Sequence, residues 1–325
     1  MNLLEINNIK KYYPIKKGVF SRTDYVKAVD GISLSIRAGE TVGIVGESGC
    51  GKSTLGKLIV RLEKATSGKI LLKGNDISRI SEKKMKAIRS SFQMVFQDPY
   101  SSLNAQKKIY SILDEVLMLF TNMSKDKRYE RILELIRMVG LEEDHLFRYP
   151  KQFSGGQRQR ICIARALAVD PEIIVADEPV SSLDVSIQAQ IINLLSDIQR
   201  ETKVSFLFIS HDMAVIENIS DRIFVMYFGK IVESGISEEI IKRPVHPYTK
   251  VLIQAVPDID KRRRGKNSMG KNTQIELITD QGCKFSNRCG FAQEICFREE
   301  PMLELVNEEK EHWCACFFKG EMKTI

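Results

Sequence analysis

The fold is decided at residues 46–53, which read Gly46-Glu47-Ser48-Gly49-Cys50-Gly51-Lys52-Ser53. This stretch matches the whole phosphate-binding loop pattern G-x-x-x-x-G-K-[ST]. Its glycines let successive backbone N–H groups turn toward one anion. Lys52 can reach the β and γ phosphates of a nucleotide, and the Ser53 hydroxyl can ligate Mg²⁺. The loop, with Thr54 directly after it, is therefore predicted to bind a nucleoside triphosphate and Mg²⁺.

The segments on either side of the loop support this interpretation. Residues 41–45 are a short apolar run with strand propensity, and residues 53–60 space their apolar side chains as a helix does. A helix that begins near Lys52 would direct its positive dipole end at the bound phosphates. The alternative, a Gly/Ser-rich turn that binds nothing, does not account for the order strand, glycine loop and helix.

Composition and charge limit the class of protein. The chain has 325 residues, of which 43% are hydrophobic and 28% charged, as in an ordinary globular protein of about two domains. It has neither an apolar run of roughly 18 residues nor a signal-peptide pattern at its start, so we expect it to stay in the cytoplasm. The net charge is +7, and a basic cluster lies at residues 261–266. Without interleaved aromatic residues, this cluster is better explained as a solvated linker than as a lipid or nucleic-acid site.

A second group of candidate residues follows a buried-type strand at residues 173–177. The strand ends in Asp177 and Glu178, and an α/β sheet places its ligands at such strand ends. Asp177 is predicted to hold Mg²⁺, and Glu178 to polarise the attacking water as general base. Two acids that merely cap the next helix are the alternative, which the upstream phosphate loop disfavours.

A second anion site is predicted where a helix opens with Ser154, Gly155, Gly156 and Gln157. Free N–H groups and a hydroxyl converge at such a helix start. Two separate phosphate-binding elements in one chain are most simply explained if two chains face each other. Each chain would then contribute its Ser-Gly-Gly element to the nucleotide of the other.

Together these residues resemble the nucleotide-binding subunits of ABC transporters, whose signature S-G-G-Q lies between the two Walker motifs. The resemblance extends over residues 1 to about 245 and implies further roles for ATP and Mg²⁺ binding. Gln97 corresponds to the loop residue that touches Mg²⁺ and contacts the membrane subunits, and Asp184, in Ser182-Leu183-Asp184, to the loop that crosses the dimer interface. His211 corresponds to the switch histidine on the γ-phosphate. Tyr13, with Tyr12 as the alternative, corresponds to the aromatic residue that stacks on adenine.

The family also implies the fold and the domains. We expect an α/β P-loop NTPase with a RecA-like parallel sheet core, an antiparallel β subdomain and a helical signature subdomain. The ABC ATPase domain would occupy residues 1–245, with its helical part at about 100–165. Residues 246–325 would form a small C-terminal extension that contains cysteines.

Finer features resemble the ATPases of peptide importers. They are residues 97–104, residues 179–186 and the stretch Arg243-Pro244-Val245-His246-Pro247-Tyr248-Thr249. The resemblance favours the F-type subunit, which would pair with a D-type ATPase on two permease subunits at the cytoplasmic face of the membrane. An extracytoplasmic substrate-binding protein would join them, and no nucleic acid is expected. The alternative function is a soluble ABC ATPase that acts on DNA or the ribosome.

The extension holds five of the seven cysteines. A small segment this rich in cysteine and this short of apolar core often needs a metal or cluster for stability. The spacing of Cys283, Cys289, Cys296 and Cys316 lacks the paired C-x₂-C of most zinc sites. The peptide-importer resemblance implies that these four hold a [4Fe–4S] cluster, with Cys314 as an alternative to Cys316. Zinc and a tail without metal are the other possibilities.

Overall fold

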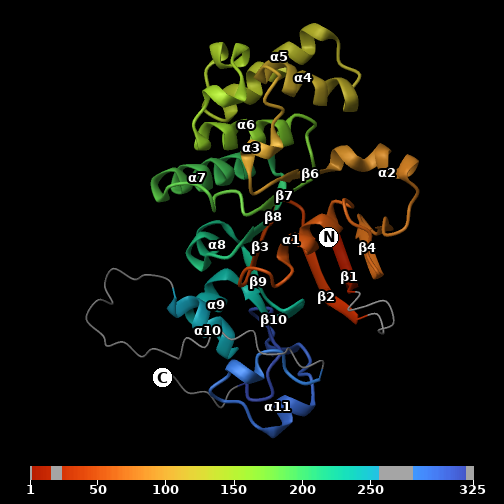
Figure 1. Ribbon diagram of the computed structural model, residues 1–325, viewed down its shortest axis with the longest axis vertical. Coiled ribbons are helices and arrows are strands. Elements are labelled where there is room, and N and C mark those ends of the chain that lie inside the picture. Colours follow the sequence, from red (N-terminus) through yellow and green to blue (C-terminus); the bar gives the residue numbers. More distant parts are fainter. Residues whose placement is uncertain (1, 16–23, 256–280, 320–325) are drawn as a thin grey trace.

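The computed structural model describes residues 2–15, 24–255 and 281–319. Figure 1 shows a helical part at one end, two sheets in the middle and a small C-terminal segment at the other end. The basic cluster at residues 261–266 lies outside the described residues. Among the described residues, no helix combines the length and apolarity needed to cross a membrane.

The larger sheet has eight strands in the order β11-β12-β10-β9-β3-β8-β7-β6. Its parallel part comprises β6 (Phe92–Val95), β7 (Ile173–Asp177), β8 (Ser205–Ser210), β3 (Thr41–Val45) and β9 (Arg222–Tyr227). Every residue of β3, β7 and β8 is buried, as expected for parallel strands covered on both faces. The predicted RecA-like core is therefore confirmed.

The smaller sheet is antiparallel and lies on the other side of the phosphate-loop helix. It has the order β2-β1-β4-β5, formed by β2 (Asp24–Arg37), β1 (Asn2–Ile15), β4 (Ser67–Leu72) and β5 (Asn75–Asp76). The helix α1 (Lys52–Ile59) buries Leu55 and Leu58 in one apolar core with Ile6 and Ile32 of this sheet and Ile209 of β8. Because α1 contacts both sheets, the loop at its start is held rigidly.

The helical part lies at the β6 end of the large sheet and fits the predicted signature subdomain. It contains α3 (Pro99–Ser102), α4 (Ile109–Phe120), α5 (Lys125–Met138) and α6 (Gly155–Leu167). Ile112, Leu135 and Ile163 of these helices share a core with Ile174 and Phe206 of the sheet. The other helices are α2 (Glu82–Ile88), α7 (Val185–Thr202), α8 (Met213–Ile219), α9 (Ser237–Lys242), α10 (Pro247–Gln254) and α11 (Glu294–Arg298).

The C-terminal segment continues the large sheet. Strand β10 (Lys230–Ile236) pairs antiparallel with β12 (His312–Cys314), which pairs with β11 (Glu304–Asn307). The buried Glu233 of β10 accepts hydrogen bonds from the backbone of Val245 and His246 and lies 2.7 Å from Nε2 of His312. The extension is thus joined to the ATPase part by a ladder and by buried polar contacts. The domain boundary between residues 245 and 246 stays a prediction.

Candidate functional site

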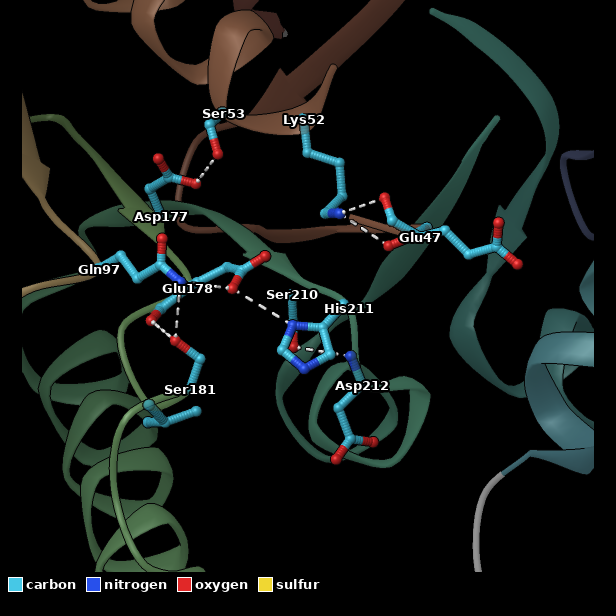
Figure 2. A network of polar contacts seen from close by, with 12 residues as sticks. Glu47, Lys52, Ser53, Gln97, Asp177, Glu178, Ser181, Ser210, His211 and Asp212 are labelled. Carbon is cyan, nitrogen blue, oxygen red and sulfur yellow. Dashed lines mark hydrogen bonds and ion pairs between the residues drawn. The ribbon is translucent and has the colours of Figure 1, made fainter. Parts of the chain in front are cut away.

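The predicted phosphate, Mg²⁺ and catalytic residues meet at the carboxyl ends of three neighbouring parallel strands. The phosphate loop follows β3, Asp177 ends β7, and His211 follows β8. Figure 2 shows these side chains converging beneath the start of α1, with Gln97 approaching from the segment after β6. This strand edge is where open α/β sheets bind ligands.

Two glycines of the loop are required by their surroundings. A Cβ on Gly46 would lie 2.1 Å from the carbonyl oxygen of Met226, and a Cβ on Gly51 would lie 2.0 Å from that of Ala28. Gly51 also has a φ of +108°, which side chains with a Cβ rarely adopt. The loop can therefore approach the neighbouring backbone only because these positions lack side chains.

Lys52 lies inside the loop and is only 4% exposed. Its Nζ donates hydrogen bonds to the carbonyl oxygens of Gly46 (2.7 Å) and Glu47 (3.0 Å). These contacts hold the ammonium group within the turn, as Figure 2 shows. A buried ammonium group with two neutral acceptors is well prepared to bind an anion.

Oxygen ligands suited to Mg²⁺ lie beside the loop. The Ser53 hydroxyl donates to Oδ1 of Asp177 over 2.8 Å. Burial raises the pKa of Asp177, because its carboxylate is largely removed from water. A divalent cation at this position would supply the missing positive charge, and hydroxyl and carboxylate oxygens are the ligands that Mg²⁺ prefers. The residues present therefore fit the predicted cation.

Glu178 is the centre of a second polar network. Its Oε2 accepts a hydrogen bond from Nε2 of Gln97 (3.0 Å) and lies 3.2 Å from Nδ1 of His211. Gln97 Nε2 also lies 3.3 Å from the Ser181 hydroxyl. The backbone of Glu178 has a φ of +48°, a strained conformation of the kind found at functional sites. The arrangement in Figure 2 thus fixes one carboxylate beside the loop, as a general base requires.

A cleft of about 560 Å³ opens in front of the loop and is large enough for a nucleotide. Residues 48–54, Gln97 and Glu178 line it, together with Tyr25 at the start of β2 and Lys284 of the extension.

Tyr13, the predicted adenine-stacking residue, is not among the residues that line this cleft. Its ring instead lies 4.8 Å from Nζ of Lys11, while the hydroxyl of Tyr12 bonds to Asp30. Tyr25, which lines the cleft and is 53% exposed, is the nearer candidate for this role, and the identity of the stacking residue stays a prediction. Tyr25 is the last aromatic residue before the loop in the sequence, and this position could have indicated Tyr25 as a candidate.

The predicted signature residues lie apart from the cleft. Ser154 caps α6: its hydroxyl accepts from the Gln157 N–H, while Oε1 of Gln157 accepts from the Ser154 N–H. Neither these two residues nor Gly155, Gly156 and Asp184 line the cleft in front of the loop. Asp184 begins α7 as an exposed residue without a side-chain cap bond, and its neighbour Val185 is 81% exposed. Ser154 and Asp184 are thus exposed on the surface, whereas Gly156 is buried.

Comparisons with known proteins agree with this geometry. The family described as "ABC transporter" matches residues 29–181, and "Oligopeptide/dipeptide transporter, C-terminal region" matches residues 232–296. The oligopeptide transport ATP-binding protein AppF of Bacillus subtilis is 48% identical over 97% of this chain and 96% of its own length. The dipeptide transport ATP-binding protein DppF of Haemophilus influenzae is 45% identical, with the same coverage of both chains.

Solved structures show the same fold. CbiO1 of Clostridium perfringens, part of the ABC transporter complex cbiONQ, has a TM-score of 0.65 and 26% identity, over 74% of this chain and 91% of its own. The ATP-binding cassette MJ0796, solved as a dimer bound to ADP and Pi in a post-hydrolysis state, has a TM-score of 0.63 and 29% identity. That match covers 72% of this chain and 98% of MJ0796.

The predicted [4Fe–4S] cluster is withdrawn. The relatives are named as ATP-binding proteins of peptide transport, and neither name mentions an iron–sulfur centre. The four cysteines, Cys283, Cys289, Cys296 and Cys316, line a common cavity of about 20 Å³, which has room for little more than one water molecule. Burial raises the pKa of the Cys283 thiol to about 11, which favours the protonated form. We therefore describe these residues as thiols that line a small apolar cavity.

Two further cysteines lie in the ATPase part of the chain. Cys50 and Cys162 are buried, and burial raises the pKa of both thiols, that of Cys162 to about 11. The cleft in front of the phosphate loop, with Asp177 and Glu178 beside it, lies in a chain that two family models match. The high identity of the relatives over nearly the whole chain agrees with it. The chain therefore belongs to the ATP-binding proteins of ABC transporters, and within them to the oligopeptide/dipeptide group.

Proposed function

We propose that this chain hydrolyses ATP to power the import of di- or oligopeptides across the cytoplasmic membrane. The observation that carries the proposal is the network around Glu178, which places one carboxylate beside the phosphate loop with Gln97 and His211 on the same oxygen. Nothing in the site or in the relatives favours the alternative of a soluble ATPase that acts on DNA or the ribosome.

Each residue has a distinct part in the proposed reaction. The N–H groups of the loop and Lys52 bind the phosphates, while Ser53, Asp177 and Gln97 would hold Mg²⁺, which offsets phosphate charge when bound. Glu178 accepts the proton of the attacking water, and His211 contacts the γ-phosphate. Tyr25 replaces Tyr13 as the residue that stacks on adenine.

The partner ATPase is proposed to complete the site. Ser154 and Asp184 are exposed and do not line this chain's own cleft, so a second subunit could reach them. MJ0796, which is dimeric with ADP and Pi bound, supports a paired arrangement. For this chain we propose a heterodimer with a D-type subunit, in which each subunit contributes its signature to the other's nucleotide.

The helical part supplies a surface for the two permeases. Large apolar side chains are exposed there on α3, on α4 and on the segment after α5: Tyr100, Met118, Leu119, Phe147 and Tyr149. Exposed apolar groups of this size are typical of binding surfaces. Gln97 directly precedes Asp98, the residue that caps α3, so movement of a permease on α3 would reach the Glu178 network. A substrate-binding protein on the other side of the membrane would deliver the peptide.

The proposal is tested with Glu178→Gln. Glutamine keeps the size of the side chain but cannot accept the proton, so we expect hydrolysis to fall at least a hundredfold while ATP stays bound. The control is Glu201→Gln, which alters an exposed acid at the end of α7. Rapid turnover by Glu178→Gln would contradict the assigned role.

A tagged pull-down from gently solubilised membranes tests the transport part separately. Two permeases and a second ATPase should be recovered with the chain. Recovery with ribosomes or DNA instead would support the alternative function.

A further inference from the structure

Arg288 of the C-terminal extension contacts the phosphate loop directly. One guanidinium nitrogen donates to Oε2 of Glu47 over 2.7 Å and the other to Oε1 over 2.8 Å. The two residues are 241 positions apart in the sequence. A paired contact of this kind fixes orientation as well as charge, because the planar fork of arginine matches both oxygens of a carboxylate.

The backbone of Glu47 is held as well. Its N–H donates to the hydroxyl of Tyr248 over 2.8 Å, and its carbonyl oxygen accepts from Lys52. The ring of Tyr248 is fully buried and lies 5.5 Å from that of Phe285, which is on the same segment as Arg288. The first turn of the loop therefore rests on an aromatic cluster that the extension helps to build.

The charge of Glu47 is a problem for a site that binds a polyanion. Glu47 is the acidic residue of the loop, and an unpaired carboxylate there would repel the phosphates and compete for Lys52. Figure 2 shows its carboxylate directed away from Lys52, and Glu47 is not among the residues that line the cleft. The side chains of Glu47 and Arg288 are 40% and 43% exposed, so packing alone does not fix this orientation.

We propose that Arg288 is a positioning residue of the ATP site. It holds the Glu47 carboxylate outside the phosphate cradle and cancels its charge, so that the C-terminal extension sets the affinity of the loop for nucleotide. The inference rests on the proposed binding of ATP by residues 46–54. Arg288 itself does not line the cleft and acts through Glu47.

The test compares charge variants in the complete transporter. Arg288→Gln should raise the KM for ATP about three- to tenfold with kcat nearly unchanged, the range expected for a partly exposed charge. The increase should shrink at high salt, which screens a repulsion between charges but does not restore lost packing. Arg288→Lys, which keeps the charge without the fork, should give an intermediate KM. The control Arg298→Gln removes an arginine from the same extension whose partner is Glu294, and its KM should equal that of the unmodified chain.

The decisive measurement repeats Arg288→Gln in a Glu47→Gln background. Without the carboxylate there is no charge to cancel, so the further change in KM should be less than twofold. An equal rise in KM in both backgrounds, or no rise in either, would overturn the proposal.

Lys52→Ala distinguishes this failure from failure of the proposed site. If Lys52→Ala abolishes binding of a fluorescent ATP analogue while Arg288→Gln has no effect, only the inference about Arg288 fails. If Lys52→Ala binds the analogue normally, the ATP site itself is wrongly placed.

Discussion

Replacing Tyr25 by alanine is expected to weaken ATP binding about five- to thirtyfold. Stacking of a base on an aromatic ring contributes about 1–3 kcal/mol by alanine substitution. Tyr25 is 53% exposed, so only part of the adenine can be removed from water against it, and we take about 1–2 kcal/mol. At about 1.4 kcal/mol per factor of ten, this gives the stated range.

Because Tyr25 is exposed, a change in affinity can be measured without a change in folding. A half-exposed side chain at the start of β2 contributes little to the core, so the variant should fold normally. Equilibrium titration of the purified chain with a fluorescent ATP analogue measures the affinity directly. Tyr25→Phe keeps the ring and should bind within a factor of two.

Tyr13→Ala is the matched comparison. It removes a tyrosine from β1, paired opposite Val26 in the same hairpin, whose ring faces Lys11 rather than the cleft. We expect less than a twofold change in affinity. A larger loss from Tyr13→Ala than from Tyr25→Ala would refute the choice of Tyr25 and restore Tyr13 as the stacking residue.

The remaining predictions concern a buried histidine and two glycines of the phosphate loop. Burial lowers the pKa of His246 from 6.5 to about 4. Because the unfolded chain binds a proton at this histidine more readily than the folded chain, acid favours unfolding. The free energy of unfolding should therefore fall by up to about 3 kcal/mol between pH 6.5 and 4. Urea unfolding at successive pH values should show a shallower fall for His246→Asn, which keeps an acceptor for the Tyr248 N–H. Gly51→Ala should abolish ATP binding, because its Cβ would lie 2.0 Å from a carbonyl oxygen. Gly49→Ala meets no atom within 4 Å and should cost only about 1–2 kcal/mol of thermal stability through its positive φ.

Much of the site could be predicted because it depends on short local patterns. The loop at residues 46–53 and the acids that end β7 lie in the order strand, loop and helix, so the sequence placed them at one sheet edge. The sequence favoured Tyr13 over Tyr25 because spacing along the chain between β1 and β2 says little about which tyrosine lines the cleft.

Contacts between residues that lie far apart in the chain could not be predicted from the sequence. Arg288 meets Glu47 across most of the chain, and no local pattern encodes that contact. The cysteines illustrate the opposite error: their shared location was inferred correctly, but spacing alone does not determine whether a cavity has room for a cluster. Burial determines both the volume of the cavity and the pKa values of the thiols that line it, and burial is a property of the folded chain.

Gln97 and His211 contact the same oxygen of Glu178, and this affects how ATP hydrolysis depends on the membrane partner. Among the described residues, the contacts of Glu178 with Gln97 and His211 both fall on Oε2. An attacking water can therefore approach the other oxygen, Oε1, while these two side chains hold the carboxylate in place. Gln97 is attached to the segment that a membrane partner would move, so engagement of the transporter would shift the carboxylate relative to the bound nucleotide and change the rate of hydrolysis.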